Sequence, residues 1–378
     1  MDFAFTEEQE MLKNAAREFV RRHCPTSFVR EMERDERGYS QEMWQEMAEL
    51  GWLGCCFPEE YGGIGGNYFD LIVLVEEFGR ALIPAPFLPT VVYCGLPILS
   101  VGTEKQKEEF LPRIAQGEIR MSLALTEQNV SCRASGIHVQ ATLDKDEYIL
   151  HGNKLFVTDA HVADWFLCVT RTREAEMEEE KGITLFLVDA KSPGIKCNLL
   201  RTMGSDKQCE VVFDHVRVPE GNRIGETDHG WNIVKKIILE GAMANCALML
   251  GGSEQVIEMV VNYAKERVQF GRPIGSFQAI QHQCADMAMD LLVSRNLSHQ
   301  AAWMISEGIP CTKEVAMAKG WVSEAYERIL FFAAKIHGAI GLTEEYDLAL
   351  YFKRAKKAQY AFGDSDFHKE LVAEALGL

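Results

Sequence analysis

The hydrophobic pattern near the start of the chain has the period of an α-helix. Thr6 can cap this segment, and the apolar positions after it recur three and four residues apart: Met11, Leu12, Ala15, Ala16, Phe19 and Val20. The pattern predicts a helix over about residues 6–22. Similar spacing predicts helices at 71–78 and 104–114, and another that ends near Gly51. The first 120 residues are therefore predicted to be mainly helical.

From Met121 the hydrophobic period shortens to that of β-strands. Seven short runs rich in β-branched and aromatic residues are separated by Gly, Asn, Asp and Pro, at residues 122–126, 137–142, 148–150, 155–158, 165–170, 183–188 and 211–218. Strands of this length and spacing predict a small barrel or sandwich.

Beyond Trp231 the helical period returns and continues to the end of the chain. It predicts long helices at about 231–268, 276–306, 312–337 and 344–373. Four long helices after a barrel predict a bundle. The predicted fold class is α+β, mainly α, with three domains: an N-terminal helical domain at 1–120, a middle β-barrel domain at 121–228 and a C-terminal four-helix bundle at 229–378.

Composition excludes several classes of protein. The 378 residues are 47% hydrophobic and 25% charged, as in folded soluble proteins, and carry a formal net charge of −17. Such an acidic chain lacks the basic surface that binds nucleic acid. The 11 cysteines never form a C-x-x-C pair, which argues against a zinc ribbon or a disulfide framework and favours a reducing cytoplasm. The acidic start of the chain is unlike a secretory signal.

The most apolar stretch of the chain, residues 83–101, contains four prolines. Each proline would interrupt a helix that crossed a bilayer. We therefore expect a packed connector here and no membrane span.

One long segment of the C-terminal region resembles a known family. Residues 263–287 read YAKERVQFGRPIGSFQAIQHQCADM, and this segment is closely similar to the acyl-CoA dehydrogenase family. Other parts of the chain share the resemblance, with PEEYGG, KDEYILHGNKLFVT, FDHVRVP and IHGAIGLTEEYDL in the same order. The order of helices, strands and helices predicted above is also the order of this family.

The resemblance implies an enzymatic activity and a cofactor. Members of the family are homotetramers or heteromeric tetramers that hold FAD between subunits and oxidise an acyl-CoA to the 2,3-enoyl-CoA. A carboxylate removes the α proton while the β hydrogen leaves as hydride to the flavin, and hydrogen bonds to the thioester carbonyl stabilise the developing enolate. FAD, an acyl-CoA substrate and an electron-transfer flavoprotein as electron acceptor are therefore expected.

The resemblance also assigns residues to a neighbouring subunit's cofactor. Arg267 matches the arginine that meets the flavin pyrophosphate, and Phe270 and Gln278 match further contacts to the same FAD. An ion pair with Glu266 on the helix surface is the alternative for Arg267. Lys335 replaces the glutamine of the family's Q-x-x-G-G pattern and could still pair with a phosphate.

The residues expected to contact the chain's own FAD match less well. The family often has T-E-P-G-x-G-S-D, where this chain reads TEQNVSCR from Thr126, without the proline and both glycines. Phe156 replaces the tryptophan that commonly packs on the flavin, and Thr158 matches the threonine that bonds near N5. Ordinary strand packing is the alternative for Phe156 and Thr158.

The usual catalytic glutamate is absent. Most relatives carry it in an E-G-T segment, but this chain reads AFGDSDFH there, with Phe362 at the position of the glutamate and Asp364 at that of the threonine. Some relatives place the base on the first long C-terminal helix, where this chain has Gly241. Glu240 is one residue away, about 100° around the helix.

Glu240 and Asp364 are therefore the candidate bases. His337 and His368 are conceivable alternatives, although a lone histidine on a helix is more often structural.

Three hypotheses follow. The chain could be a subunit of a heteromeric acyl-CoA dehydrogenase that completes the flavin site of a sister chain. It could instead be an active homomeric flavoenzyme with a relocated base, acting on a cyclic or branched acyl-CoA. The third possibility is a non-redox structural partner or acyl-CoA binder.

Overall fold

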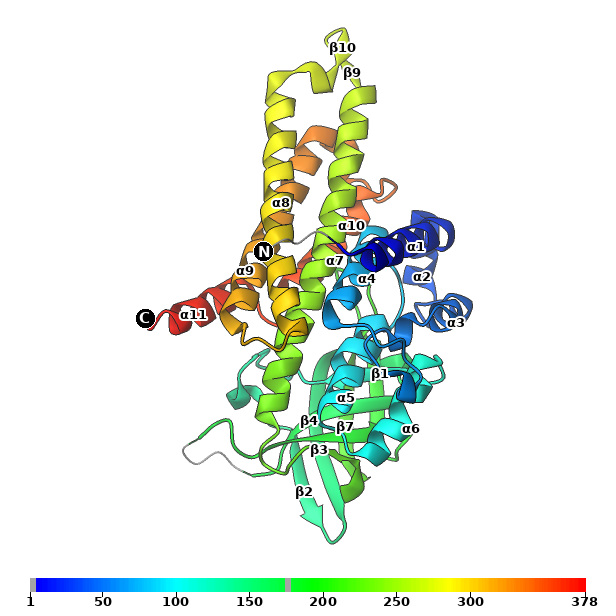
Figure 1. Ribbon diagram of the computed structural model, residues 1–378, viewed down its shortest axis with the longest axis vertical. Coiled ribbons are helices and arrows are strands. Elements are labelled where there is room, and N and C mark those ends of the chain that lie inside the picture. Colours follow the sequence, from blue (N-terminus) through cyan, green and yellow to red (C-terminus); the bar gives the residue numbers. More distant parts are fainter. Residues whose placement is uncertain (1–4, 174–177) are drawn as a thin grey trace. The chain divides into compact units, whose positions relative to one another are not determined.

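The computed structural model describes residues 5–173 and 178–378 (Figure 1). The N-terminal third is mainly helical, as predicted, with α1 (Glu7–His23), α2 (Thr26–Arg34), α3 (Gln41–Glu49), α4 (Tyr68–Ala81), α5 (Leu96–Val101) and α6 (Glu104–Ala115). Helix α1 begins in a capping box, because Thr6 Oγ1 accepts from the backbone N–H of Gln9 and the Gln9 side chain accepts from that of Thr6. The pattern analysis missed α2. The proline-rich connector is a π-helix (Leu88–Gly95) followed by α5, and most of it is buried.

Internal contacts divide the chain into two compact units. Unit 1 contains the described residues up to Glu31, residues 67–83 and residues 242–378. Unit 2 contains residues 32–66 and 84–241. The division into three domains expected from the sequence stays a prediction.

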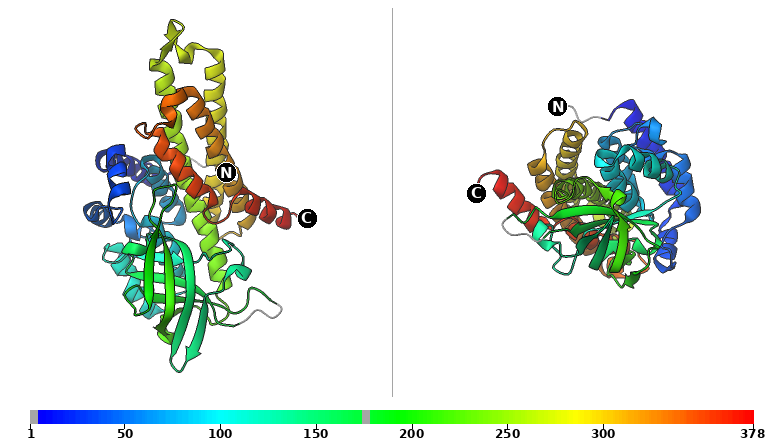
Figure 2. Two further views of the ribbon diagram at one scale, coloured as in Figure 1. Left: turned by 180° about the vertical axis from the view of Figure 1, so that it is seen from behind. Right: turned by 90° about the horizontal axis from the view of Figure 1, so that it is seen from below.

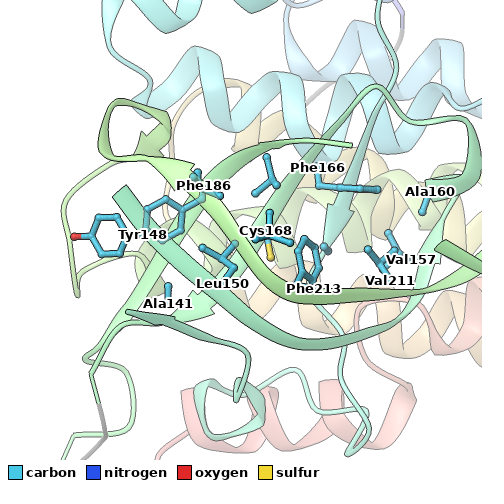
Figure 3. Packing of buried hydrophobic residues seen from close by; sticks show 14 of the residues in the cluster. Ala141, Tyr148, Leu150, Val157, Ala160, Phe166, Cys168, Phe186, Val211 and Phe213 are labelled. Carbon is cyan, nitrogen blue, oxygen red and sulfur yellow. The ribbon is translucent and has the colours of Figure 1, made fainter. Parts of the chain in front are cut away.

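Unit 2 is built on one mixed sheet. Its strands are β1 (Met121–Ala124), β2 (Gln140–Asp144), β3 (Glu147–Thr158), β4 (Trp165–Arg171), β5 (Ile183–Asp189), β6 (Ile195–Leu200), β7 (Gln208–Pro219) and β8 (Arg223–Ile224). They pair in the order β6-β7-β3-β2-β4-β5-β8, and β1 pairs in parallel with β4. Apolar side chains of these strands, including Tyr148, Phe166, Phe186 and Phe213, pack into the core of the unit (Figure 3).

The sheet corrects part of the sequence prediction. The path ends at β6 on one side and at β8 on the other, and the described strands do not close into the predicted barrel. The runs at 148–150 and 155–158 are not separate strands, because β3 stays paired with β7 across both of them. Two irregularities in that pairing absorb the intervening residues. Strand β6 was missed because its exposed residues do not alternate with buried ones.

The C-terminal region contains the long helices α7 (Trp231–Glu266), α8 (Gln278–Ser306) and α9 (Thr312–His337), then α10 (Leu348–Tyr360) and α11 (Ser365–Ala375). A small hairpin of β9 (Val268–Gln269) and β10 (Arg272–Pro273) joins α7 to α8 (Figures 1 and 2). The last predicted helix is thus two helices, interrupted at residues 361–364. No described helix has both the length and the apolar character needed to cross a bilayer.

Glycines let α4 approach α7 closely within unit 1. A Cβ on Gly251 would lie 1.8 Å from the Glu76 carbonyl oxygen, and one on Gly79 would lie 2.2 Å from the Leu248 carbonyl oxygen. Any larger residue at either position would push the two helices apart.

Candidate functional site

In unit 2, the backbone brings the predicted residues Thr126 and Phe156 together. Thr126 follows β1, and its carbonyl oxygen accepts a hydrogen bond of 2.8 Å from the backbone N–H of Leu155. The next residue, Phe156, has a φ of 54° and lies where the β3–β7 register shifts. This bulge leaves the Phe156 side chain 47% exposed. The geometry therefore presents an aromatic face beside the Thr126 turn.

Thr158 is the last residue of β3 and follows that bulge by one residue. Its carbonyl oxygen accepts a hydrogen bond of 2.8 Å from Ser122 Oγ on β1, and its side chain is half-buried. The structure thus gathers Thr126, Phe156 and Thr158 along the adjoining ends of β1 and β3.

A buried ion pair stabilises the Thr126 turn. Lys154 Nζ is fully buried and lies 2.6 Å from Glu127 Oε1 and 3.0 Å from the Leu125 carbonyl oxygen. The Glu127 carboxylate also accepts the backbone N–H groups of His138 and Val139. Sequence reasoning missed this pair, although the T-E dipeptide that survives from the family motif was its signal. Glu127 has a structural role here.

The remainder of this turn lacks the glycines of the family pattern. Val130 takes a left-handed φ of 45° and is exposed, and its backbone N–H donates to the Glu127 carbonyl oxygen. A β-branched residue is strained in that conformation. The turn therefore keeps a compact shape without the two glycines that would bare its N–H groups.

In unit 1, three predicted residues lie where α7 ends and α8 begins (Figure 1). Arg267 follows α7 directly and is exposed, Phe270 is 93% exposed in the β9–β10 hairpin, and Gln278 opens α8. Phe270 has a φ of 54°, so the hairpin itself fixes its position. We call these residues the α7–α8 tip.

The Arg267 side chain has no acidic partner among the described residues. Its side chain forms no ion pair with Glu266 or with any other described acid. The helix-surface ion pair considered as its alternative role is therefore absent from the described residues. An exposed guanidinium in this position is open to a group from outside the chain.

Lys335 lies in the last turn of α9 and is exposed. The end of this helix contacts the end of α7, because the rings of His337 and Tyr263 lie 4.5 Å apart. Burial lowers the pKa of His337, and its Nδ1 donates to the Ala333 carbonyl oxygen. Lys335 and Arg267 thus belong to neighbouring helix ends of unit 1.

Glu240 lies on α7 within unit 2 and is only 5% exposed. Burial raises the pKa of this carboxyl to about 7, although Lys236 Nζ at 3.8 Å favours the charged form. A carboxyl with such a pKa can take up and release a proton near neutral pH.

Asp364 caps α11. Its Oδ1 accepts a hydrogen bond of 2.9 Å from the backbone N–H of Phe367, as an N-cap aspartate does. Phe362, which stands at the position of the usual base, has a φ of 57° and cannot accept a proton through its side chain. The structure brings Asp364 and Phe362 into one short break between helices, whereas Glu240 belongs to unit 2.

A buried lysine organises the break at residues 361–364. Lys319 on α9 is completely buried and donates to the carbonyl oxygens of Ala358, Gln359 and Gly363. His368 Nε2 donates to the Phe362 carbonyl oxygen, and burial together with Lys319 lowers the pKa of His368 to about 4. His368 is therefore neutral at pH 7 and holds the segment by a hydrogen bond.

Comparison with known proteins identifies the fold. Models of the N-terminal, middle and C-terminal domains of acyl-CoA dehydrogenases match residues 6–118, 122–216 and 228–377. A short-chain-specific acyl-CoA dehydrogenase of Megasphaera elsdenii is 34% identical over 386 residues and covers 100% of both chains. This chain belongs to the acyl-CoA dehydrogenase family.

Solved structures support that assignment. The butyryl-CoA dehydrogenase of Megasphaera elsdenii superimposes with a TM-score of 0.94 at 33% identity and covers 100% of both chains. A chain of the ChsE4–ChsE5 complex of Mycobacterium tuberculosis superimposes with a TM-score of 0.91 at 27% identity, covering 100% of this chain and 99% of that one. The α+β fold predicted from the sequence is therefore confirmed.

Membership of the acyl-CoA dehydrogenase family implies FAD, and the side chains present fit this group in part. Unit 2 offers an exposed aromatic face at Phe156 and a hydroxyl at Thr158, and unit 1 offers an exposed cation at Arg267. The aromatic face suits the isoalloxazine ring of FAD, and the hydroxyl suits the hydrogen-bonding edge of that ring. The cation suits the pyrophosphate. The glycine-free turn at Thr126 is the part that departs from the family.

Proposed function

We propose that this chain is an FAD-dependent acyl-CoA dehydrogenase subunit that works in a heteromeric assembly. Arg267, Phe270 and Gln278 would contact the FAD of a sister chain, and Lys335 would pair with a phosphate near it. The observation that carries this proposal is the α7–α8 tip, whose side chains are exposed and match the family. The chain's own base position, by contrast, holds Phe362.

The reaction of the assembly is α,β-dehydrogenation of an acyl-CoA thioester. A carboxylate of the catalytic sister chain would take the α proton. FAD, when bound, would supply the acceptor for the β hydrogen and its electron pair, so that the C–C single bond becomes a double bond. At the chain's own FAD, Phe156 would lie against the ring, and Thr158 and Thr126 would hydrogen-bond at its edge. Arg267 would instead neutralise the pyrophosphate charge of the sister chain's FAD.

The proposal includes a setting for the assembly. The assembly would be a heterotetramer of this chain with a sister acyl-CoA dehydrogenase subunit, and an electron-transfer flavoprotein would be its electron acceptor. The eleven cysteines are all free thiols, which suits a reducing cytoplasm. The complex of ChsE4 with ChsE5 supports the idea that this fold assembles heteromerically.

The visible spectrum of the purified chain tests the proposal. The expected result is little or no flavin, or flavin that no acyl-CoA thioester bleaches under anaerobic conditions. Co-expression with a sister acyl-CoA dehydrogenase should then yield a mixed tetramer whose flavin is bleached. Stable tetramers of this chain alone, each subunit with one reducible FAD, would overturn it.

A second function is favoured by Glu240. A buried carboxyl with a pKa of about 7 suits a relocated base in a homomeric enzyme on a cyclic or branched acyl-CoA. Under this alternative an acyl-CoA thioester bleaches the flavin band of the chain alone. Glu240→Gln should abolish this bleaching while the flavin stays bound. Asp364→Asn is the parallel test of the other candidate, and normal turnover by both variants would exclude both residues. An acyl-CoA complex without any bleaching would identify the non-redox binder.

A further inference from the structure

A second irregularity in the β3–β7 pairing gathers three side chains on the surface of unit 2. Leu150 pairs with Val216 and Gly152 with Phe213, so His151 on β3 faces two residues of β7, Asp214 and His215. This arrangement is a β-bulge, and His215 takes a left-handed φ of 54° within it. In a regular strand the side chains of Asp214 and His215 would point to opposite faces. The bulge instead brings both beside His151.

The three side chains are in direct contact. Asp214 Oδ1 lies 2.8 Å from His215 Nδ1 and 3.9 Å from His151 Nδ1. The two imidazole rings lie 4.5 Å apart, and the hydrogen bond from His215 lowers the pKa of the Asp214 carboxyl. One potential ligand atom from each residue lies within 4.8 Å of the other two. Among the described residues, no other group of three such side chains converges in this way.

We infer that His151, Asp214 and His215 bind a divalent transition-metal ion of the zinc class. Zinc takes imidazole nitrogen and carboxylate oxygen at about 2.0–2.2 Å, which places tetrahedral ligand atoms about 3.4 Å apart. Exposed side chains can close from 4.8 Å to that spacing by rotation about χ1 and χ2. Water completes the coordination. Two imidazoles exclude the hard ions Mg²⁺ and Ca²⁺, which select oxygen ligands.

The ligands come from two strands, so a bound ion should stabilise the pairing of those strands. A bound ion would join β3 to β7 at a bulge, where one residue is left outside the ladder of hydrogen bonds. Binding to the folded state alone stabilises it by mass action. Lys196 on the adjacent strand β6 opposes the ion, since its charge also acts on Asp214. Removal of that charge should tighten the site.

The inference does not depend on the proposed dehydrogenase function. The site lies on a part of β3 that precedes Phe156 by five residues, about 16 Å along a strand. It is therefore tested with the metal ion alone, by readouts that need neither flavin nor substrate.

The test titrates the full chain, first stripped by a chelator, with Zn²⁺ against a chromophoric zinc indicator. A Cys197→Ser background removes the exposed thiol, which could bind zinc by itself. The expected result is one ion per chain, a rise in melting temperature with Zn²⁺, and no response to Mg²⁺. His151→Ala and His215→Ala should each weaken binding at least ~10-fold and abolish the thermal response.

Two further variants make the result decisive. His138→Ala removes an exposed histidine of unit 2 outside the cluster and should leave affinity unchanged. Lys196→Gln should raise affinity several-fold. The inference is overturned if the wild-type chain binds Zn²⁺ no more tightly than the double variant His151→Ala/His215→Ala, provided that circular dichroism shows both chains folded.

Discussion

The turn at Thr126 in unit 2 and the α7–α8 tip in unit 1 are both predicted to meet FAD, yet they differ in what holds them. The turn rests on a fully buried lysine and on backbone hydrogen bonds of β1 and β3. The tip is exposed, and Arg267 has no acidic partner among the described residues. A residue that matches the family pattern can therefore be explained by contacts within the chain, as Glu127 is. Otherwise, as for Arg267, it requires a contact with a group from outside the chain.

The largest effect is expected from breaking the internal support of the turn. Lys154→Met leaves the Glu127 carboxylate buried without its cation, which costs about 3–5 kcal/mol of unfolding free energy. Urea denaturation followed by circular dichroism measures this loss. Lys196→Gln removes an exposed lysine of the same unit and should change stability by less than about 0.5 kcal/mol. Equal stability of the Lys154→Met variant and the wild-type chain would show that the pair does not hold the turn.

Glu240 gives a pH-dependent effect in the same unit. Because the folded state raises its pKa to about 7, the folded state binds a proton that the unfolded chain releases near its ordinary value. Stability contributed by the protonated form is present below about pH 4.5 and is lost as pH rises through about 7.

Glu240→Gln mimics the protonated carboxyl at every pH. The variant should therefore match the wild-type chain near pH 4.5 and exceed it by about 2–3 kcal/mol at pH 8. Urea melts at both values measure the difference, with Glu108→Gln on the exposed face of α6 as control. A constant difference across pH would mean that Glu240 does not carry this proton.

A substitution in the α7–α8 tip should affect FAD binding and leave stability unchanged, whereas a substitution that breaks the support of the turn lowers stability. Arg267→Ala should leave the melting temperature unchanged, since its side chain forms no described ion pair. It should weaken FAD binding by the proposed assembly about 10- to 100-fold, because a charge-assisted hydrogen bond is worth about 1.5–3 kcal/mol. Flavin retained after gel filtration measures this effect. Lys265→Ala removes a neighbouring exposed cation, and an equal loss with that variant would reduce Arg267 to a general charge effect.

Phe156 should give the smallest effect. Its side chain is half exposed at a bulge, so Phe156→Ala should cost at most about 1 kcal/mol of stability. Phe156→Trp restores the residue that relatives commonly carry. In the chain reconstituted with FAD it should shift the flavin absorption band without a loss of flavin content. An unchanged flavin spectrum in both variants would remove Phe156 from the cofactor contacts.

The sequence predicted elements well where one period extends over many residues. The three long helices α7, α8 and α9 lie within two residues of the expected bounds, because a helical period over 26 residues or more leaves little ambiguity. The break at residues 361–364 was missed although its signals were present, with Gly363 after α10 and Asp364 as the cap of α11.

The bulges could not be predicted. At Phe156 and His215, ordinary residues take left-handed φ values because the paired strand forces them to. The sequence around His151 reads HGN and favoured a turn, yet β7 pairs across it. The side chains that converge at these bulges come from register, which is a property of two strands and not of either one.

The buried amine of Lys319 makes the helix break chemically observable. Its Nζ is enclosed by the carbonyl oxygens of Ala358, Gln359 and Gly363, so an amine-reactive reagent cannot reach it in the closed state. Acylation of Lys319 therefore requires the end of α10 to open first. Under native conditions the rate at which this one lysine is labelled, compared with exposed lysines, reports how often the segment beside Phe362 comes apart.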